Sequence, residues 1–340
     1  MSAQIFGLDI GRAFIKLAQI STNGGRKELV AVGKASTPAE GLKTESKPIL
    51  KELSEVIKNL VKSSKASSNK CSVSIVEAQA VTRLVELPNL TDKELSSAIN
   101  WEADQYIPLP LEDVNLQYKV VFRPPPGSVG GKMQVILIAA PKKVVEKYVE
   151  VIKMAGLSLQ AIETESASLA RALSQPQDPL SLIVSMGAVS SELILVKGGN
   201  VYFSRSIASG GLALTKTIIS EFSISEKQAE EYKMAYGLIE DKLSGKIAAV
   251  LRPALDILTA EILKAVEYGR THMQGDLLNR AIICGGGSYL PGLAEYFTEK
   301  TSMEVLLGDP WADFSKQGLI LKVPGQASFY SVATGLALRS

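Results

Sequence analysis

The feature that most constrains the fold is a strand pair, turned at a glycine, that occurs twice. The first copy runs from Ile5 to Ala18 and turns at Gly11, and the second runs from Leu182 to Leu195 and turns at Gly187. Each copy has an apolar strand, a tight turn and a second apolar strand. A duplicated hairpin at this distance along the chain predicts two similar halves with a cleft between them.

The two copies differ in the polar residues that they place at matching positions. With the turn glycines aligned, Asp9 stands opposite Ser185, and Lys16 stands opposite Glu192. A third strand follows each hairpin, and helix, strand and helix then follow in both halves, with insertions. The order predicts an α/β protein built from two duplicated βββαβα lobes around a central cleft.

The length of the chain and the positions of its prolines predict how it divides into domains. A chain of 340 residues is long enough for two domains. The segment 175–179, with two prolines, is the predicted boundary, so the lobes are expected at 1–175 and 176–340. The first lobe should carry a small α+β insert at about 87–139, and the second a helical subdomain at about 212–275.

Composition excludes several classes of function. The 37 basic and 35 acidic residues give a net charge of +2, which offers no electrostatic reason to expect nucleic acid or a bulk anionic membrane as a partner. One histidine and two distant cysteines are too few for a zinc site. No segment is apolar enough to span a bilayer, so we expect a soluble cytoplasmic chain that reaches the membrane only through a partner.

The first hairpin carries a candidate phosphate site. Gly11 permits a tight turn whose N–H can approach a phosphate, and Lys16 on the returning strand can add a positive charge. Asp9 can hold Mg²⁺ through the waters of the ion, because Mg²⁺ keeps much of its hydration shell. A plain hairpin with a turn aspartate and an edge lysine explains the same residues, and both interpretations stay open.

A second candidate is the turn Gly285-Gly286-Gly287 between a predicted strand and a helix. Three glycines let the backbone pass close to a ligand, and the start of the next helix offers free N–H groups. No Gly-Lys-Ser/Thr follows, so the turn is not a P-loop. Close packing alone is the alternative explanation of these glycines.

Together these motifs resemble the two phosphate motifs and the adenosine motif of the actin, Hsp70 and sugar-kinase superfamily. Further stretches resemble the PilM family of type IV pilus assembly proteins, which is close to FtsA. These stretches are Leu87-Pro88, Ala98–Pro110, Gly156-Leu157, Arg205–Ile207, Glu230–Gly237 and Gly308–Pro310. The resemblance covers nearly the whole chain in order.

The resemblance implies an actin-like, ATP-binding protein, with ATP and Mg²⁺ as cofactors, peripheral to the inner membrane on its cytoplasmic face. It also implies partners: the N-terminal cytoplasmic peptide of PilN, and through it the pilus motor and platform proteins. The residues implied at the nucleotide are Asp9, Gly11, Arg12 and Lys16 in the first motif, Gly187, Ala188 and Ser190 in the second, Glu230 and Lys233 at the ribose and base, and Gly285, Gly286, Gly287 and Ser288 in the adenosine loop.

Two departures from the family pattern bear on hydrolysis. The family usually has a small residue where this chain has Arg12, and an aspartate where it has Ser185. Loss of that carboxylate removes a partner of the Mg²⁺ shell, while Arg12 can offset phosphate charge directly. We therefore expect ATP binding with weak or absent ATPase activity. Glu165 is the candidate water-positioning carboxylate, unless it is a solvent-facing residue at a helix start.

A peptide site is predicted in the insert. Trp101, Tyr106 and Pro108 combine aromatic surface with a rigid helix end, which suits a groove for an extended peptide between the first lobe's sheet and the insert. The alternative is that both aromatic residues dock the insert onto its lobe.

Two other functions compete. An active phosphotransferase of the same fold would need a carboxylate base and a substrate pocket, and no Asp-Gly-rich motif stands between residues 70 and 90. A filament-forming actin-like protein and a homo-oligomer are both compatible with the sequence.

Overall fold

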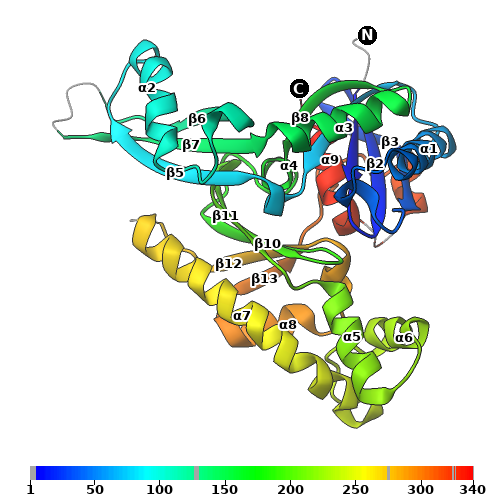
Figure 1. The fold of residues 1–340 in the computed structure, drawn as a ribbon. Coiled ribbons are helices and arrows are strands. Elements are labelled where there is room, and N and C mark those ends of the chain that lie inside the picture. Colours follow the sequence, from blue (N-terminus) through cyan, green and yellow to red (C-terminus); the bar gives the residue numbers. More distant parts are fainter. Residues whose placement is uncertain (1–4, 126–129, 274–275, 324, 326, 340) are drawn as a thin grey trace.

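Two five-stranded sheets with the same strand order form the centre of the molecule (Figure 1). The computed structural model describes residues 5–125, 130–273, 276–323, 325 and 327–339. The first sheet has the order β3-β2-β1-β4-β8 and the second β11-β10-β9-β12-β13. Their strands are β1 (Phe6–Ile10), β2 (Phe14–Asn23), β3 (Arg26–Ser36), β4 (Lys70–Ile75) and β8 (Ser158–Thr164), then β9 (Ser181–Met186), β10 (Ser191–Lys197), β11 (Asn200–Ile207), β12 (Arg280–Cys284) and β13 (Glu304–Leu307).

The repeated three-strand meander is confirmed in both sheets. β1, β2 and β3 pair antiparallel in sequence order, as do β9, β10 and β11, while β4 and β12 add in parallel to the first strand of each meander. Each sheet then gains a fifth parallel strand. The second of these, β13, was not predicted, because a run of four residues is too short for a period to be recognised.

The helices of the two lobes occupy the segments where apolar residues recur at helical spacing. They are α1 (Lys47–Ser63), α3 (Lys142–Met154) and α4 (Glu165–Leu173), then α5 (Gly211–Phe222), α6 (Glu226–Tyr236), α7 (Lys246–His272), α8 (Leu293–Thr301) and α9 (Ser331–Ala337). The end of the predicted helical subdomain, at 275, lies outside the described residues. None of the helices in the described ranges has an apolar stretch long enough to cross a bilayer.

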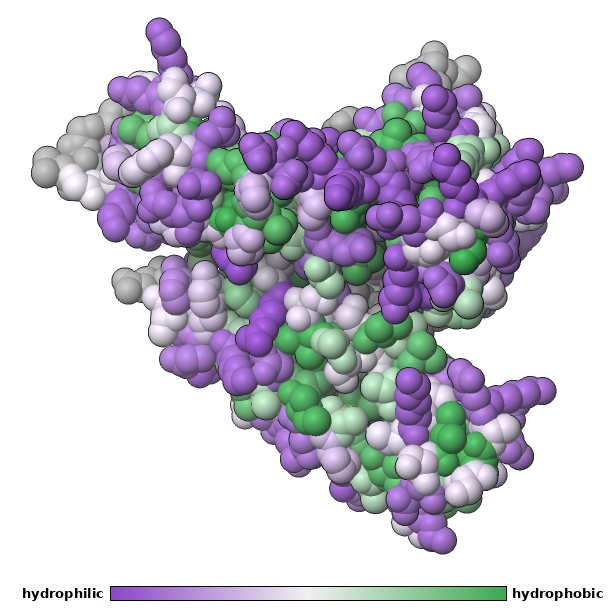
Figure 2. Space-filling view, viewed as in Figure 1, coloured by the Kyte–Doolittle hydropathy of each residue, from purple (hydrophilic) through white to green (hydrophobic). Residues whose placement is uncertain are grey.

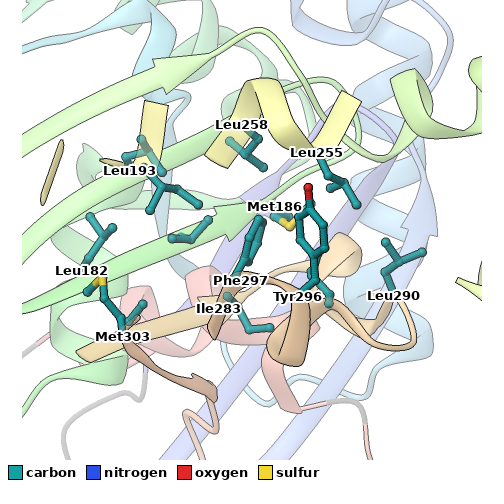
Figure 3. Packing of buried hydrophobic residues seen from close by; sticks show 14 of the residues in the cluster. Leu182, Met186, Leu193, Leu255, Leu258, Ile283, Leu290, Tyr296, Phe297 and Met303 are labelled. Carbon is teal, nitrogen blue, oxygen red and sulfur yellow. The ribbon is translucent and has the colours of Figure 1, made fainter. Parts of the chain in front are cut away.

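Each sheet has its own apolar core. In the second lobe, side chains from β9, β10 and β12 meet those of α7 and α8, with Leu193, Phe297 and Met186 among the residues that point toward one another (Figure 3). In the first lobe, β1 and β2 pack against α1 and α3. This packing makes each sheet a rigid base for the hairpin turn at its edge.

The last helix of the chain packs on the first sheet. α9 contacts β1, β2 and β4, and its other side contacts α4. The helix approaches so closely that a Cβ on Gly7 would lie 1.9 Å from the Ala333 carbonyl oxygen. In turn, Leu169 of α4 packs in a cluster with Ile183 and Ile282 of the second sheet. The two lobes therefore exchange helices at their junction, which the order of elements did not predict.

The insert of the first lobe is a three-stranded sheet, β5-β7-β6, with one helix. Its elements are β5 (Val81–Pro88), α2 (Asp92–Asp104), β6 (Val114–Phe122) and β7 (Lys132–Pro141). The capping box predicted at Thr91 and Glu94 is confirmed, because the Glu94 N–H donates to Thr91 Oγ1 at 3.3 Å while Thr91 N–H donates to Glu94 Oε2 at 2.8 Å.

The register of the insert shows which end faces the lobe. β5 ends at Pro88, paired with Lys132, and α2 starts beyond this outer end. β6 starts at Val114, paired with Pro141, and α3 begins directly after Pro141. The chain therefore returns along α2 toward the first lobe, and residues 105–113 lie at the junction of insert and lobe.

Candidate nucleotide site

A cavity of about 940 Å³ lies between the two lobes, near the upper end of the range of small-molecule sites. Figure 2 shows apolar side chains along the notch between the upper and lower parts of the molecule, with polar residues over the outer faces. The cavity brings together almost every residue predicted to contact a nucleotide. These are Asp9, Gly11, Arg12, Lys16, Glu165, Gly187, Ala188, Ser190, Glu230, Lys233, Gly285, Gly286 and Gly287.

The first hairpin places a charged pair on the cavity wall. Asp9 and Lys16 are cross-strand neighbours, and Lys16 Nζ lies 2.5 Å from Asp9 Oδ2. The other carboxylate oxygen, Oδ1, is buried and makes no hydrogen bond within the described residues. A buried acceptor without a donor is costly, so this atom is a ready partner for a bound cation or for water carried by one. Among the described residues the pair therefore lines the cavity with a free acceptor, which fits the predicted phosphate and metal site.

The role predicted for the Gly11 N–H needs correction. This N–H donates to the Phe14 carbonyl at 3.1 Å, which closes its own turn, and the Gly187 N–H closes the second turn on Ser190 at 2.9 Å. The duplication thus extends to matching hydrogen bonds. Neither glycine N–H is free for a phosphate, so backbone donors at the first turn have to come from its tip, at Arg12 and Ala13, which line the cavity.

The second hairpin carries its carboxylate on the neighbouring strand. Ser185 and Glu192 are cross-strand partners, as Asp9 and Lys16 are in the first sheet. Glu192 Oε1 accepts hydrogen bonds from the hydroxyls of Ser190 and Ser206, both at 2.9 Å, while Oε2 is buried without a donor among the described residues. The carboxylate that Ser185 lacks is thus supplied by Glu192, which the sequence analysis aligned but did not count as a site residue.

Three carboxylates share one side of the cavity. Glu165 begins α4 and lines the cavity with Asp9 and Glu192, so it is not the solvent-facing residue of the alternative interpretation. Burial raises the pKa of Glu165 well above its usual range, and the charges on Asp9 and Glu192 raise it further, while Lys16 lowers it. A carboxyl with a raised pKa keeps its proton to a higher pH than usual, and in that form it can donate a hydrogen bond as well as accept one.

Glu192 gives a test of these electrostatics in the nucleotide-free protein. Burial raises its pKa from 4.5 to about 7, against the lowering effect of the two serine hydroxyls. The pKa of Glu192 is higher in the folded protein than in the unfolded chain. The free energy of unfolding is therefore at its full value below about pH 4.5, where Glu192 is protonated in both states, and part of it is lost as pH rises through about 7. Glu192→Gln should therefore stabilise the protein at pH 8 by on the order of 2 kcal/mol.

Thermal unfolding of parent and variant at pH 5 and pH 8 measures this difference, which should nearly vanish at pH 5. Glu231→Gln, which changes an exposed carboxylate on α6, is the matched control and should leave both midpoints unchanged. An equal effect of Glu192→Gln on stability at both pH values would contradict the raised pKa of Glu192.

The glycine turn after β12 serves two purposes. Gly285 has φ +83°, and a Cβ there would lie 2.7 Å from the Met186 carbonyl oxygen. Gly287 has no room for a side chain either, because a Cβ there would lie 2.7 Å from the Met186 Cβ. These two positions require glycine for packing. Gly286 differs, because a Cβ there would contact only the Phe329 ring, at 3.5 Å and 3.6 Å, and it faces the cavity. Close packing therefore explains Gly285 and Gly287, while a contact between Gly286 and a ligand stays a prediction.

Ser288 does not line the cavity. Its side chain is buried, and its hydroxyl donates to the Gly285 carbonyl at 2.7 Å. The prediction of a ligand contact here was wrong, because the turn continues as a 3₁₀ helix, Gly286–Tyr289, which directs this side chain inward. Ser288 holds the loop in shape.

The far wall of the cavity comes from α5 and α6. Lys233 of α6 is buried, and its Nζ donates to Glu230 Oε2 at 2.6 Å, Thr215 Oγ1 at 2.8 Å and the Gly211 carbonyl at 3.1 Å. The start of α5 is held against the second hairpin, because Gly211 N–H donates to the Gly187 carbonyl at 2.9 Å. Helix and hairpin therefore form one unit that can move with the second lobe.

Among the cavity residues that the sequence did not predict are two aromatic residues and a lysine. Phe329, just before α9, lies with its ring centroid 4.9 Å from Lys16 Nζ and 5.4 Å from Lys34 Nζ. Phe14 meets the same ring edge to face at 5.7 Å between centroids. The one available signal was the position of an aromatic residue at a helix start, which is too common to indicate a site.

The predicted peptide-binding residues lie apart from the cavity, in the insert. Trp101, on α2, has 71% of its surface exposed, and Tyr106 has 40% exposed. Pro108 is exposed as well and lies with Tyr106 in the segment at the junction of insert and lobe. The interpretation that both aromatic side chains dock the insert onto its lobe does not hold for Trp101, which is mostly in solvent.

Two duplicated lobes that exchange helices and enclose a cleft between glycine turns define the actin-like ATPase fold. The sequence matches the family described as type IV pilus assembly protein PilM over residues 7–340. The chain therefore belongs to the PilM family. This assignment does not favour the phosphotransferase or filament alternatives.

Curated relatives agree with the fold class. The chain is 25% identical to the ethanolamine utilization protein EutJ of Escherichia coli over 152 residues, which is 45% of this chain and 49% of that protein. The aligned part thus spans about half the length of this relative. It is 20% identical to the cell division protein FtsA of Streptococcus pneumoniae, over 89% of this chain and 75% of FtsA.

Two solved structures match the fold of this chain over nearly its full length. A PilM-PilN type IV pilus biogenesis complex matches with a TM-score of 0.83 and 26% identity, covering 100% of this chain and 99% of that one. MreB5 of Spiroplasma citri bound to AMPPNP matches with a TM-score of 0.54 and 15% identity, over 98% and 95% of the two chains. The second likeness shows the fold alone.

Proposed function

We propose that this chain is the nucleotide-binding component of a type IV pilus assembly platform, and that it binds the N-terminal cytoplasmic tail of a PilN protein. The observation that carries the proposal is the full-length family match together with a cavity that gathers the expected nucleotide residues. The matching structure is of a PilM-PilN complex, which supports the same kind of partner here.

ATP is the ligand that suits the cavity. Lys16, Lys34 and Arg12 provide positive charge on the first-lobe side, where phosphates would lie. Glu230 and Lys233 on α6 line the same cavity and would meet the ribose and base, and Gly286 lines it as well. A nucleotide in this position would contact both lobes and favour their closed arrangement.

Mg²⁺ fits the carboxylates at this site. Asp9 and Glu192 each have a buried oxygen without a donor among the described residues, and such atoms suit the waters around a cation. The described residues contain no group of three or more His, Cys, Asp or Glu side chains that could hold a metal ion directly. When bound, the ion would offset phosphate charge. Asp9 and Glu192 would orient its waters.

The peptide would bind between the first lobe's sheet and the insert. Tyr106 and Pro108 lie where α2 returns to the lobe, and Trp101 stands one turn earlier on the same helix. A short, extended tail of a membrane protein would bring the chain to the cytoplasmic face of the inner membrane. Through this contact the protein would connect the PilN alignment complex to the pilus motor and platform proteins.

Hydrolysis of ATP should be slow. Ser185 stands where the family usually has an aspartate, and burial raises the pKa of both Glu165 and Glu192, which line the cavity. Turnover should therefore lie well below about 1 per second, the lower end of the range of working kinases. A phosphate-release assay measures it, and a rate within the kinase range would exclude a binding role without catalysis.

The double variant Ser185→Asp with Glu192→Gln moves the carboxylate to the family's usual position without adding a charge. It should raise turnover if the position of this carboxylate limits the reaction. An unchanged rate would show that another group is limiting.

Two titrations test the proposal as a whole. Calorimetry of nucleotide-free protein with ATP and Mg²⁺ should show saturable binding. A synthetic peptide with the sequence of the N-terminal cytoplasmic tail of a PilN protein from the same organism should bind as well. No heat and no thermal shift at millimolar ATP would exclude the nucleotide site, and failure of the peptide to bind would exclude the partner.

A further inference from the structure

Glu77 lies where the first lobe, the insert and the second lobe meet. It follows β4 in a single 3₁₀ turn, and its side chain is buried, with 4% of its surface exposed. Its Oε1 accepts hydrogen bonds from the hydroxyl of Ser204 on β11 and from Thr82 Oγ1 on β5, the latter at 3.3 Å. Its Oε2 accepts the Ser166 N–H at the start of α4, at 3.2 Å. One carboxylate thus joins the insert, the second lobe and the helix that crosses between lobes.

This set of donors explains why a buried carboxylate is stable without a paired cation. An unpaired charge in the interior costs several kcal/mol, whereas three donors and the positive end of α4 offset that cost. Glu77 does not line the cavity. Its main-chain N–H, however, donates to Oε2 of Glu165 at 3.4 Å, and Glu165 does line it. Glu77 is therefore one residue removed from the nucleotide site.

The insert also rests on the second lobe through apolar contacts. Leu84 of β5 and Val121 of β6 pack against the second lobe's core, beside Phe203 and Tyr268. β5 contacts β11, and Figure 1 shows β5 passing over that strand. The opposite face of the insert sheet packs under α2, the helix that carries Trp101. A movement of β11 is thus passed directly to the sheet beneath α2.

We infer that Glu77 is a positioning residue that couples the nucleotide cleft to the insert. Ser204 moves with the second lobe and Thr82 with the insert, and both donate to the same oxygen of Glu77. Closure of the lobes on a nucleotide changes the position of Ser204, so the bond to Thr82 and the start of β5 must readjust. The inference rests on the proposed nucleotide site and adds the residue through which that site acts on the peptide groove.

Hydrogen exchange read by mass spectrometry, on the full chain with and without AMPPNP and Mg²⁺, tests the inference. In the parent, the nucleotide slows exchange in the two cleft hairpins and also changes it in β5 and α2. In Glu77→Ala the cleft response remains and the insert response is lost. Glu77→Gln keeps an oxygen for the hydroxyls, so it restores the insert response.

Ser204→Ala is the second variant, should Glu77→Ala fold poorly. It removes the donor on the second lobe while Glu77 still caps α4, and it should also lose the insert response. The same variants are then titrated with the tail peptide, with and without nucleotide. In the parent, nucleotide should change the affinity for the tail peptide by a factor of roughly five or more. In Glu77→Ala and Ser204→Ala this factor should fall to about one.

Each outcome has a distinct meaning. If the insert responds in folded Glu77→Ala and Ser204→Ala as it does in the parent, Glu77 is not the coupling residue. If the parent shows cleft protection without any response of the insert, the coupling is overturned while the nucleotide site stands. If no segment is protected by nucleotide, the proposed nucleotide site fails, and the inference fails with it.

Discussion

Gly286→Asp should abolish nucleotide binding while leaving the protein folded. A Cβ at Gly286 meets only the Phe329 ring at ordinary contact distance, so the chain tolerates a side chain there. The carboxylate, however, enters the space for the nucleotide and adds negative charge near its phosphates, which costs about 1–4 kcal/mol per pair of charges near a surface. We expect at least a ~100-fold loss of affinity for ATP, measured by calorimetry.

Two other variants of the same turn separate binding from folding. Gly286→Ala adds only a methyl group at ordinary contact distance from the Phe329 ring and should bind ATP within severalfold of the parent. Gly287→Ala forces a Cβ to 2.7 Å from Met186 Cβ, so it should lower the unfolding temperature whether or not ATP is present. Folded Gly286→Asp that binds ATP as tightly as the parent would place the nucleotide elsewhere.

Trp101→Ala should weaken the complex with the tail peptide by roughly thirtyfold or more. Loss of a central aromatic anchor commonly costs ~2 kcal/mol or more at an interface, which corresponds to about thirtyfold in affinity. Because 71% of the Trp101 surface is exposed, its removal leaves the fold of the insert intact. Tyr106→Ala should act in the same direction. ATP binding should not change in either variant.

Phe122→Ala provides the matched control for these aromatic substitutions. Phe122 is 48% exposed in the same insert, but it lies at the outer end of β6, away from the first lobe. Its loss should not affect the peptide, which fluorescence anisotropy with a labelled tail can measure for all three variants. Should Trp101→Ala and Tyr106→Ala bind as the parent does, the groove lies elsewhere on the molecule.

Much of the fold followed from signals that act between near neighbours. Turn glycines at Gly11 and Gly187, alternating apolar residues in both meanders, and the capping box at Thr91 each depend on residues a few positions apart. The physical rules for turns, strands and helix starts are local, so a sequence displays them directly. The duplicated lobes were predicted on that basis, and nearly all the residues that the family resemblance implied at a nucleotide line the cavity.

The wrong predictions share one cause: the sequence did not show in which direction a group points. Gly11 was expected to offer its N–H to a ligand, but that N–H closes its own turn. Ser288 was expected in the cavity, but a 3₁₀ turn directs it inward. Both residues were placed in the correct segment. Which way a group points depends on backbone angles and hydrogen bonds that residue type alone does not specify.

By itself the sequence determined the two-lobed α/β plan, the family, and the segments that line the cleft, because each depends on local patterns that occur in order along the chain. The tertiary structure decided the rest. Glu77 meets Ser204 across 127 positions, and α9 packs on the first sheet from the far end of the chain. Such contacts depend on how the sheets and crossing helices pack as a whole. They also select Glu192, Phe329 and Lys34, which no local motif marks, as walls of the cavity.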